Sequence, residues 1–175
     1  MIIIDPDLEP GLSPQSRTLE RSQRSAQTSI SRDQIPSTPA LARFLREAQL
    51  QVKLRGEVTV LLTTDAAIRH LNRRFRGKNK ATDVLSFPAD ELIREREGIA
   101  GDLAISVSTA RRQAADQGHS LRDEIKILML HGLLHLAGYD HETDNGKMAR
   151  REQKLRLKLR LRDGLIERTE RGPRL

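Results

Sequence analysis

Residues 121–141 read LRDEIKILMLHGLLHLAGYDH and form the most apolar stretch of the chain. Ser120 with Asp123 makes a capping-box-like start and Gly138 makes an end, so the pattern predicts a helix over 121–137. Apolar residues occupy nearly every side of this helix. Because a helix that is hydrophobic all round is normally buried, we expect it at the centre of the fold.

Three histidines in this stretch have the spacing of a metal site. His131 and His135 are one helical turn apart, so both imidazoles project from the same face. Gly138 can adopt a positive φ angle and turn the chain so that His141 approaches the same ion. Two polar rings buried side by side cost free energy unless something such as a metal satisfies them. We therefore predict that these three histidines bind one metal ion and take part in catalysis.

The expected metal is a single zinc-type ion. Three protein ligands leave one tetrahedral position for water, which is typical of catalytic rather than structural zinc. Three imidazoles also suit nickel, cobalt or copper, so the identity of the metal stays open. The chain has no cysteine, which excludes a Cys-based zinc site. The other two histidines, His70 and His119, are expected to be ordinary residues with satisfied rings.

The residue after the first histidine argues against a zinc peptidase. The spacing HxxxHxxGxxH also occurs in metzincin proteases, in which a Glu at that position is the general base. Here the position holds Gly132, so a peptidase of the usual mechanism would lack its proton acceptor. Hydrolysis of a phosphodiester bond in RNA fits better, because the 2′-OH of RNA can itself attack. A zinc peptidase stays as a disfavoured alternative.

Charge and hydropathy favour a nucleic-acid partner. Among 175 residues, 31 Lys and Arg exceed 24 Asp and Glu, and the net charge is +7. Such an excess favours a polyanion through phosphate contacts and counterion release. No segment approaches the roughly 18 apolar residues of a membrane span, and the N-terminus lacks a signal-peptide pattern. We expect a cytoplasmic protein with no membrane partner.

The rest of the sequence predicts strands and helices around the central helix. We expect an N-terminal strand with a polar, mobile segment over 1–36, a metal-dependent hydrolase domain over 37–162, and a basic C-terminal tail over 163–175. Further helices are expected over 38–50 (with Thr38 as N-cap), 66–75, 108–117 and 145–162, strands over 2–4, 57–63, 83–88 and 103–107, and a loop or hairpin tip over 90–97. The predicted fold class is α+β, a small mixed β-sheet packed with helices around a central apolar helix that bears the metal-binding histidines.

Two further blocks point to a known family. LNRRFRGKNKATDVLSFP (71–88) and GDLAIS (101–106), together with the histidine stretch, resemble the signatures of the YbeY family, bacterial metal-dependent endoribonucleases. The resemblance implies a single-strand-specific endoribonuclease in ribosomal RNA maturation, including processing of the 16S rRNA 3′ end, and in ribosome quality control. It implies ribosomal RNA and the ribosome or small-subunit proteins as partners, and no dinucleotide cofactor.

The resemblance also implies roles for single residues. The three histidines match the metal ligands of the family, and Arg76 matches the basic residue proposed to engage the substrate phosphate. A guanidinium can hold two phosphate oxygens and stabilise charge that develops at phosphorus. Asp83, Ser86 and Asp102 are expected to shape or support the site without a catalytic step, and Asp83 and Asp102 could equally be turn acids at strand ends.

Several points stay open at the level of sequence. The proton acceptor is unidentified, with Asp140 and Glu142 as candidates. Asn79 and Ala81 stand where many relatives carry an acid and a proline, so the loop before the DVLSFP strand is expected to be looser and more basic. From Thr143 onward, eleven Lys or Arg stand against five Asp or Glu, either as a solvated helix face or as an RNA contact. The alternative from another class is a non-catalytic ribosome assembly factor with a structural metal.

Overall fold

The computed structural model describes residues 1–8, 34–141 and 143–161. Most of the expected polar N-terminal segment and all of the expected basic tail lie outside these ranges. The elements follow in the order β1 (Ile2–Ile4), η1 (Pro6–Leu8), α1 (Thr38–Val52), β2 (Glu57–Thr63), α2 (Asp65–Arg76), β3 (Val84–Pro88), α3 (Glu91–Glu97), β4 (Ile99–Ser106), α4 (Val107–Gln117), α5 (Leu121–Leu136) and α6 (Lys147–Lys158).

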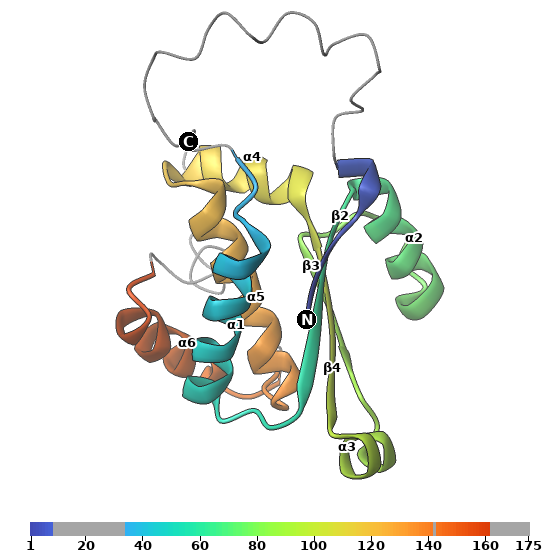
Figure 1. Ribbon diagram of the computed structural model, residues 1–175, viewed down its shortest axis with the longest axis vertical. Coiled ribbons are helices and arrows are strands. Elements are labelled where there is room, and N and C mark those ends of the chain that lie inside the picture. Colours follow the sequence, from blue (N-terminus) through green and yellow to red (C-terminus); the bar gives the residue numbers. More distant parts are fainter. Residues whose placement is uncertain (9–33, 142, 162–175) are drawn as a thin grey trace, which may run out of the picture.

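Four strands form one mixed sheet in the order β1-β2-β4-β3. β1 pairs parallel with β2, β2 pairs parallel with β4, and β3 pairs antiparallel with β4. Figure 1 shows α1, α4, α5 and α6 on one side of the sheet and α2 on the other. The prediction of an α+β fold with a small mixed sheet is confirmed.

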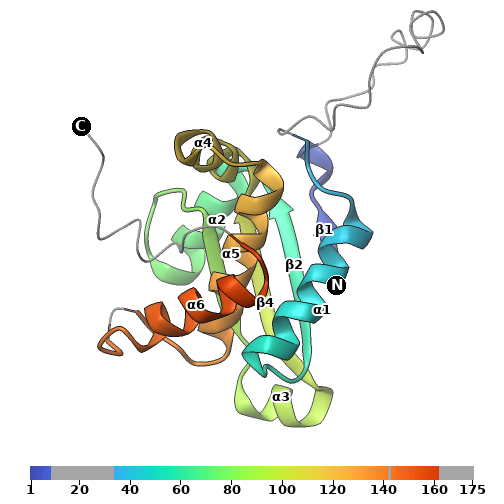
Figure 2. The ribbon, with the colours of Figure 1, turned by 90° about the vertical axis from the view of Figure 1, so that its left-hand side faces the viewer.

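Helix α5 is the centre of this arrangement, as its composition predicts. Twelve of its sixteen residues are buried, so it is enclosed on almost every side. It packs against β3 and β4 on one side and against α1, α4 and α6 on others, as Figures 1 and 2 show. Ser120 caps its N-terminus by accepting a hydrogen bond from the backbone N–H of Asp123 at 3.1 Å. No helix in the described ranges is long and apolar enough to cross a membrane.

Strand β4 presents its two faces to different helices. The side chain of Leu103 lies against Gly132 of α5. Ala104 belongs instead to a small cluster with Leu85 and Ile68, the latter from α2. Because successive strand residues point to opposite faces, Asp102 lies on the face that α2 covers and points away from α5.

Residues 90–97 are a helix rather than the expected loop. Asp90 caps it by accepting a hydrogen bond from the backbone N–H of Ile93 at 2.9 Å, and Gly98 ends it with a φ of +66°. The charged residues between them are good helix formers. The prediction failed because a helix of two turns without a buried face shows no hydrophobic periodicity.

Several element boundaries also differ from the prediction. β4 begins at Ile99 rather than 103, because its pairing with β2 starts before the apolar run. Helix α1 is capped at Ser37 rather than Thr38, and its N-cap side chain makes no capping hydrogen bond. The last helix begins at Lys147 and ends at Lys158, shorter than the expected 145–162.

Candidate metal centre

Three imidazoles converge at the end of α5 and in the loop that follows it. His131 and His135 are one turn apart on α5, and their Nε2 atoms are 3.1 Å apart. His141 joins them from the loop, with its ring centroid 5.5 Å from that of His131 and 5.3 Å from that of His135. One ligand atom from each residue lies within 4.8 Å of the others. Because the coordinating nitrogens of a tetrahedral zinc are about 3.3 Å apart, only a small adjustment would bring all three onto one ion.

The turn after α5 explains how His141 reaches this position. Gly138 has a φ of +88°, a conformation that residues with a Cβ rarely adopt. The backbone N–H of Tyr139 donates to the carbonyl of Leu134 at 3.0 Å, which closes the helix end. The chain then runs back past the last turn of α5. The role predicted for Gly138 is confirmed.

A buried carboxylate from α6 orients the first histidine. Oε2 of Glu152 lies 3.0 Å from Nδ1 of His131, and both side chains are almost fully buried. With Nδ1 held in this way, Nε2 is the ring nitrogen that faces His135. A carboxylate on the second nitrogen fixes the orientation of a metal-binding imidazole and raises its basicity.

The sequence analysis missed Glu152, although a signal was present. Met148, Glu152 and Leu155 follow one another at helical spacing, and all three are buried in the structure. An acid within the apolar stripe of a helix needs a buried partner. That partner is His131, so Glu152 in this stripe could have been linked to the histidine cluster.

The environment of His135 keeps its ring neutral. Burial of the ring, followed by repulsion from His131 and His141 when they are charged, lowers the pKa of His135 to about 4. A hydrogen bond with the backbone of Tyr139 acts in the opposite direction and is outweighed. At neutral pH the ring is therefore uncharged, which is the form that binds a metal.

Arg76 is tied to the strand that packs against the metal-bearing helix. It is the last residue of α2, and its Nη2 donates to the carbonyl of Ser86 in β3 at 3.2 Å. The hydroxyl of Ser86 in turn lies 3.5 Å from the carbonyl of Gly132, the residue after His131. The guanidinium is exposed, so most of its donors face solvent.

The other polar residues of the signature blocks make structural contacts. Asp83 accepts hydrogen bonds from the backbone N–H of Val84 at 2.8 Å and from Nε2 of Gln113 at 3.0 Å. Asp102 is exposed on the opposite face of the sheet from α5. Asp83 directly precedes β3 and so matches the strand-end alternative, whereas Asp102 lies within β4. Ser86 is the one of the three in contact with α5.

Gly132 faces the sheet, where a larger residue would force the neighbouring side chains to shift. A Cβ atom there would lie 2.7 Å from Cδ2 of Leu103 and 3.3 Å from the hydroxyl of Ser86. A glutamate in the manner of the zinc peptidases would therefore collide with β3 and β4. Of the candidate proton acceptors, Asp140 is partly buried and accepts a hydrogen bond from the hydroxyl of Thr143 at 2.9 Å, whereas Glu142 lies outside the described residues.

The basic loop after α2 is anchored at two points. Nδ2 of Asn72 donates to the carbonyl of Lys80 at 2.7 Å, and Nε of Arg69 donates to Oδ1 of Asn79 at 2.9 Å. The Asn79 side chain thus pairs with a cation of α2. Lys78 and Lys80 are exposed, so their ammonium groups are accessible to an anionic ligand.

Comparisons with known proteins agree with these observations. The family profile described as Endoribonuclease YbeY matches residues 20–160. Proteins named Endoribonuclease YbeY from Koribacter versatilis and Solibacter usitatus are 53% and 52% identical, over 76% and 75% of this chain and 84% and 86% of their own. The solution structure of a Thermotoga maritima protein superposes with a TM-score of 0.50 at 29% identity, covering 71% of this chain and 85% of that one. From the extent of the profile match and these identities, we conclude that the chain belongs to the YbeY endoribonuclease family.

Proposed function

We propose that this protein is a metal-dependent endoribonuclease that uses one zinc ion held by His131, His135 and His141. The convergence of three imidazoles, with their ligand atoms within 4.8 Å of one another, carries the proposal. Membership of a family whose relatives are named endoribonucleases supports RNA as the substrate. When bound, the ion would supply Lewis acidity toward a phosphate oxygen and would acidify a water molecule.

The chain's own residues prepare the imidazoles for this role. Glu152 accepts a hydrogen bond from Nδ1 of His131 and so leaves Nε2 as the nitrogen that would bind the ion. The lowered pKa of His135, caused first by burial, keeps its ring unprotonated at neutral pH. Little rearrangement is therefore required when the metal binds, which favours both affinity and a fixed geometry.

Arg76 would neutralise the scissile phosphate. One of its donors is anchored on the carbonyl of Ser86, and this leaves the other N–H groups for phosphate oxygens. Lys78 and Lys80 follow Arg76 closely in the sequence and would extend the positive charge along the RNA backbone. A mobile lysine contributes mainly charge, whereas the anchored guanidinium contributes orientation as well.

The substrate would be single-stranded ribosomal RNA, including the 3′ end of 16S rRNA, in the cytoplasm. Ribosomal proteins of the small subunit would be its partners. The net charge of +7 supports binding to such a polyanion. Strand preference is testable with matched RNAs, one single-stranded and one folded into a hairpin of the same composition.

The decisive experiment combines elemental analysis with RNA cleavage. Wild-type protein is compared with Arg76→Ala and with a control, Arg43→Ala, which changes an exposed arginine of α1. Arg76→Ala should retain one metal per chain and lose at least about tenfold in kcat/KM, the scale of one lost phosphate contact. Equal cleavage by both variants would contradict the role of Arg76.

Removal of the metal separates catalysis from folding. The sheet and α5 share an extensive apolar core, so a chelator should abolish cleavage and leave the circular dichroism spectrum unchanged. A chelator that unfolds the chain would instead indicate a structural metal, as expected for the non-catalytic assembly factor. Restoration of cleavage by zinc, and by which other ions, would identify the metal.

A further inference from the structure

A pocket with four cationic side chains lies next to the segments that hold the metal ligands. Its volume is about 610 Å³, within the range of about 300 to 1,000 Å³ typical of small-molecule sites. Lys53 and Arg55 reach it from the segment after α1, Arg94 from α3 and Arg151 from α6. No carboxylate lines it among the described residues. Four like charges around one cavity repel one another unless an anion occupies it.

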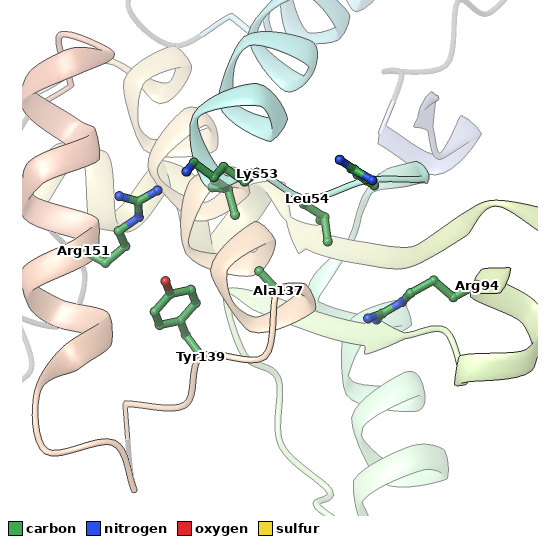
Figure 3. Close-up of a pocket in the computed structure, with 8 residues that line it drawn as sticks. Lys53, Leu54, Arg94, Ala137, Tyr139 and Arg151 are labelled. Atoms are coloured by element: carbon green, nitrogen blue, oxygen red, sulfur yellow. The ribbon is translucent and has the colours of Figure 1, made fainter.

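Two of these cations are fixed by the fold. Nη2 of Arg151 donates to the carbonyl of Gln51 at 2.9 Å, and its buried Nε has no hydrogen-bond partner in the part of the chain that the structure describes. Nη2 of Arg94 lies 3.5 Å from the carbonyl of Leu136. Figure 3 shows Arg94 and Arg151 reaching the pocket from opposite sides. The buried, unpartnered N–H of Arg151 is a donor that a ligand oxygen could satisfy.

The rest of the lining is apolar and aromatic. Leu54, Ala137 and the ring of Tyr139 form a surface beside the cations, with Tyr139 close to Arg151 in Figure 3. A site that combines cations with an aromatic ring suits a ligand with a phosphate and a flat base. A simple anion such as sulfate would use the cations and leave this surface uncovered.

Two of the segments that line the pocket also contribute residues to the candidate metal centre. Tyr139 lies between His135 and His141 in the sequence, and its backbone is hydrogen-bonded to His135. Arg151 directly precedes Glu152, which contacts His131. A ligand in the pocket would therefore touch the two segments that position the metal ligands.

We propose that this pocket binds one nucleotide, with its phosphate on the cations and its base against Tyr139. The source of the nucleotide, an RNA chain that extends from the metal centre, rests on the proposed function. The pocket is then a subsite that holds a nucleotide away from the scissile bond and thereby sets the register of cleavage. A free nucleotide has the same chemistry and is the other source that an experiment must distinguish.

The composition of the chain provides a direct probe. Tyr139 is the one tyrosine in a sequence without tryptophan, so intrinsic tyrosine fluorescence reports on this pocket alone. The full chain is titrated with a single-stranded 2′-O-methyl oligoribonucleotide, which lacks a free 2′-OH, and separately with adenosine 5′-monophosphate. N-acetyltyrosinamide corrects for absorption by the bases. We expect saturable quenching by the oligonucleotide.

Paired variants test whether the cations act specifically. Lys53→Gln with Arg55→Gln should raise the oligonucleotide Kd about tenfold or more and lower the salt dependence of log K by up to about 0.7, the value for one phosphate contact on a single strand. Arg43→Gln with Arg46→Gln is the control, because it removes two exposed cations from α1 and changes the net charge equally. The control should leave the quenching curve nearly unchanged.

Each outcome decides the proposal. Quenching by the oligonucleotide but not by the mononucleotide supports a subsite for the RNA chain, and quenching by the mononucleotide supports a site for a free nucleotide. No quenching by either ligand, or an equal loss of affinity in both paired variants, overturns it. Since quenching requires no cleavage, RNA cleavage without quenching would refute the subsite and leave the proposed function intact.

Discussion

Two buried histidine–glutamate pairs involve helix α5, one near each end. His119 and Glu124 pair at its N-terminal end, with side chains 2% and 0% exposed. His131 and Glu152 pair near its C-terminal end, with side chains 6% and 2% exposed. Burial and partner type are thus nearly identical, yet only the second pair belongs to the metal centre.

The difference lies in which ring nitrogen the carboxylate holds. Glu124 contacts Nε2 of His119, whereas Glu152 contacts Nδ1 of His131 and leaves Nε2 facing His135. His119 and Glu124 are only five residues apart, and their contact joins the turn between α4 and α5 to the first turns of α5. The second pair spans 21 residues and joins α5 to α6. The carboxylate on Nδ1 of His131 leaves its Nε2 directed at the other imidazoles of the candidate metal centre, which is the geometry that a metal ligand requires.

The largest expected effect separates the two histidines. His131→Ala should reduce bound metal to background and kcat/KM by at least about a thousand-fold, the scale of removing a principal catalytic group. Elemental analysis and an RNA cleavage assay measure both. His119→Gln keeps a donor for Glu124 and should retain one metal per chain. Cleavage that survives in His131→Ala would refute the site.

The two glutamates should also differ in their effect on metal affinity, with the larger effect at Glu152. Glu152→Gln is expected to weaken metal affinity by about 10- to 100-fold, because the neutral amide oxygen accepts a weaker hydrogen bond from Nδ1 of His131 and raises the basicity of the imidazole less than a carboxylate does. Competition with a chromophoric chelator measures the affinity. Glu124→Gln should leave the affinity within about twofold and lower the free energy of unfolding by about 1–3 kcal/mol. Equal metal affinities in the two variants would remove the distinction between the pairs.

A substitution at Gly132 tests how closely α5 packs against the sheet between its two histidine–glutamate pairs. Gly132→Ala places a methyl group 2.7 Å from Cδ2 of Leu103, so the buried Leu103 side chain, or α5 or β4 with it, must shift. We expect a loss of about 1–3 kcal/mol in the free energy of unfolding, measured by urea denaturation. Ala115→Gly, at an exposed position of α4, is a control for helix propensity with an expected loss of about 1 kcal/mol. An unchanged stability in Gly132→Ala would show that the contact is easily relieved.

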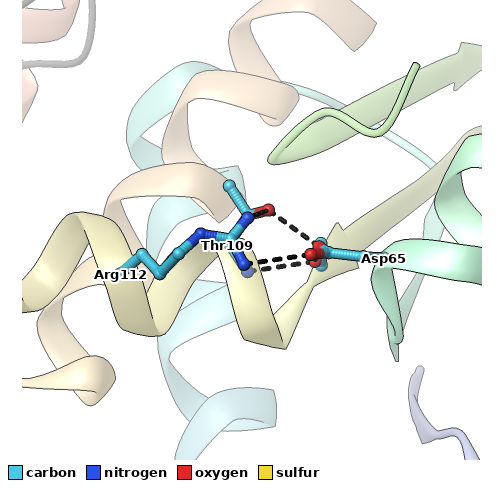
Figure 4. A network of polar contacts seen from close by, with 4 residues as sticks. Asp65, Thr109 and Arg112 are labelled. Atoms are coloured by element: carbon cyan, nitrogen blue, oxygen red, sulfur yellow. Dashed lines mark hydrogen bonds and ion pairs between the residues drawn. The ribbon is translucent and has the colours of Figure 1, made fainter.

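The smallest expected effect is on stability and concerns Asp65, a carboxylate that belongs to neither histidine–glutamate pair. Burial alone would raise the pKa of Asp65, but hydrogen bonds from Ser106, Thr109 and Arg112 outweigh it, and the pKa is lowered from 3.8 (Figure 4). The side chain is about one-third exposed, so Asp65→Asn should cost only about 0.5–1 kcal/mol at pH 7.

The pH dependence of this cost has a defined sign. A depressed folded-state pKa contributes stability above the unfolded value, and the contribution disappears as the pH falls through the folded-state pKa. The difference in unfolding free energy between wild type and Asp65→Asn should therefore be constant from about pH 5 to 8 and shrink toward about pH 3. A difference that grows on acidification would contradict the network as the cause.

The sequence by itself determined the central helix and the histidine cluster. An apolar stretch with a capping serine and a terminal glycine specifies α5 through local chemistry. The spacing of His131 and His135 places their imidazoles on one face because the helical repeat fixes the geometry. These features depend on neighbours in the chain, so no other part of the fold was needed to infer them.

Only the tertiary structure decided the partners of these residues. Glu152 reaches His131 because α6 packs against α5, and the four cations of the pocket come from three segments that are distant in the sequence. Asp102 turned away from α5 because the alternation of β4 placed Leu103 on that face. His119 and His131 are the same residue type, and their different roles follow from which ring nitrogen a folded neighbour reaches.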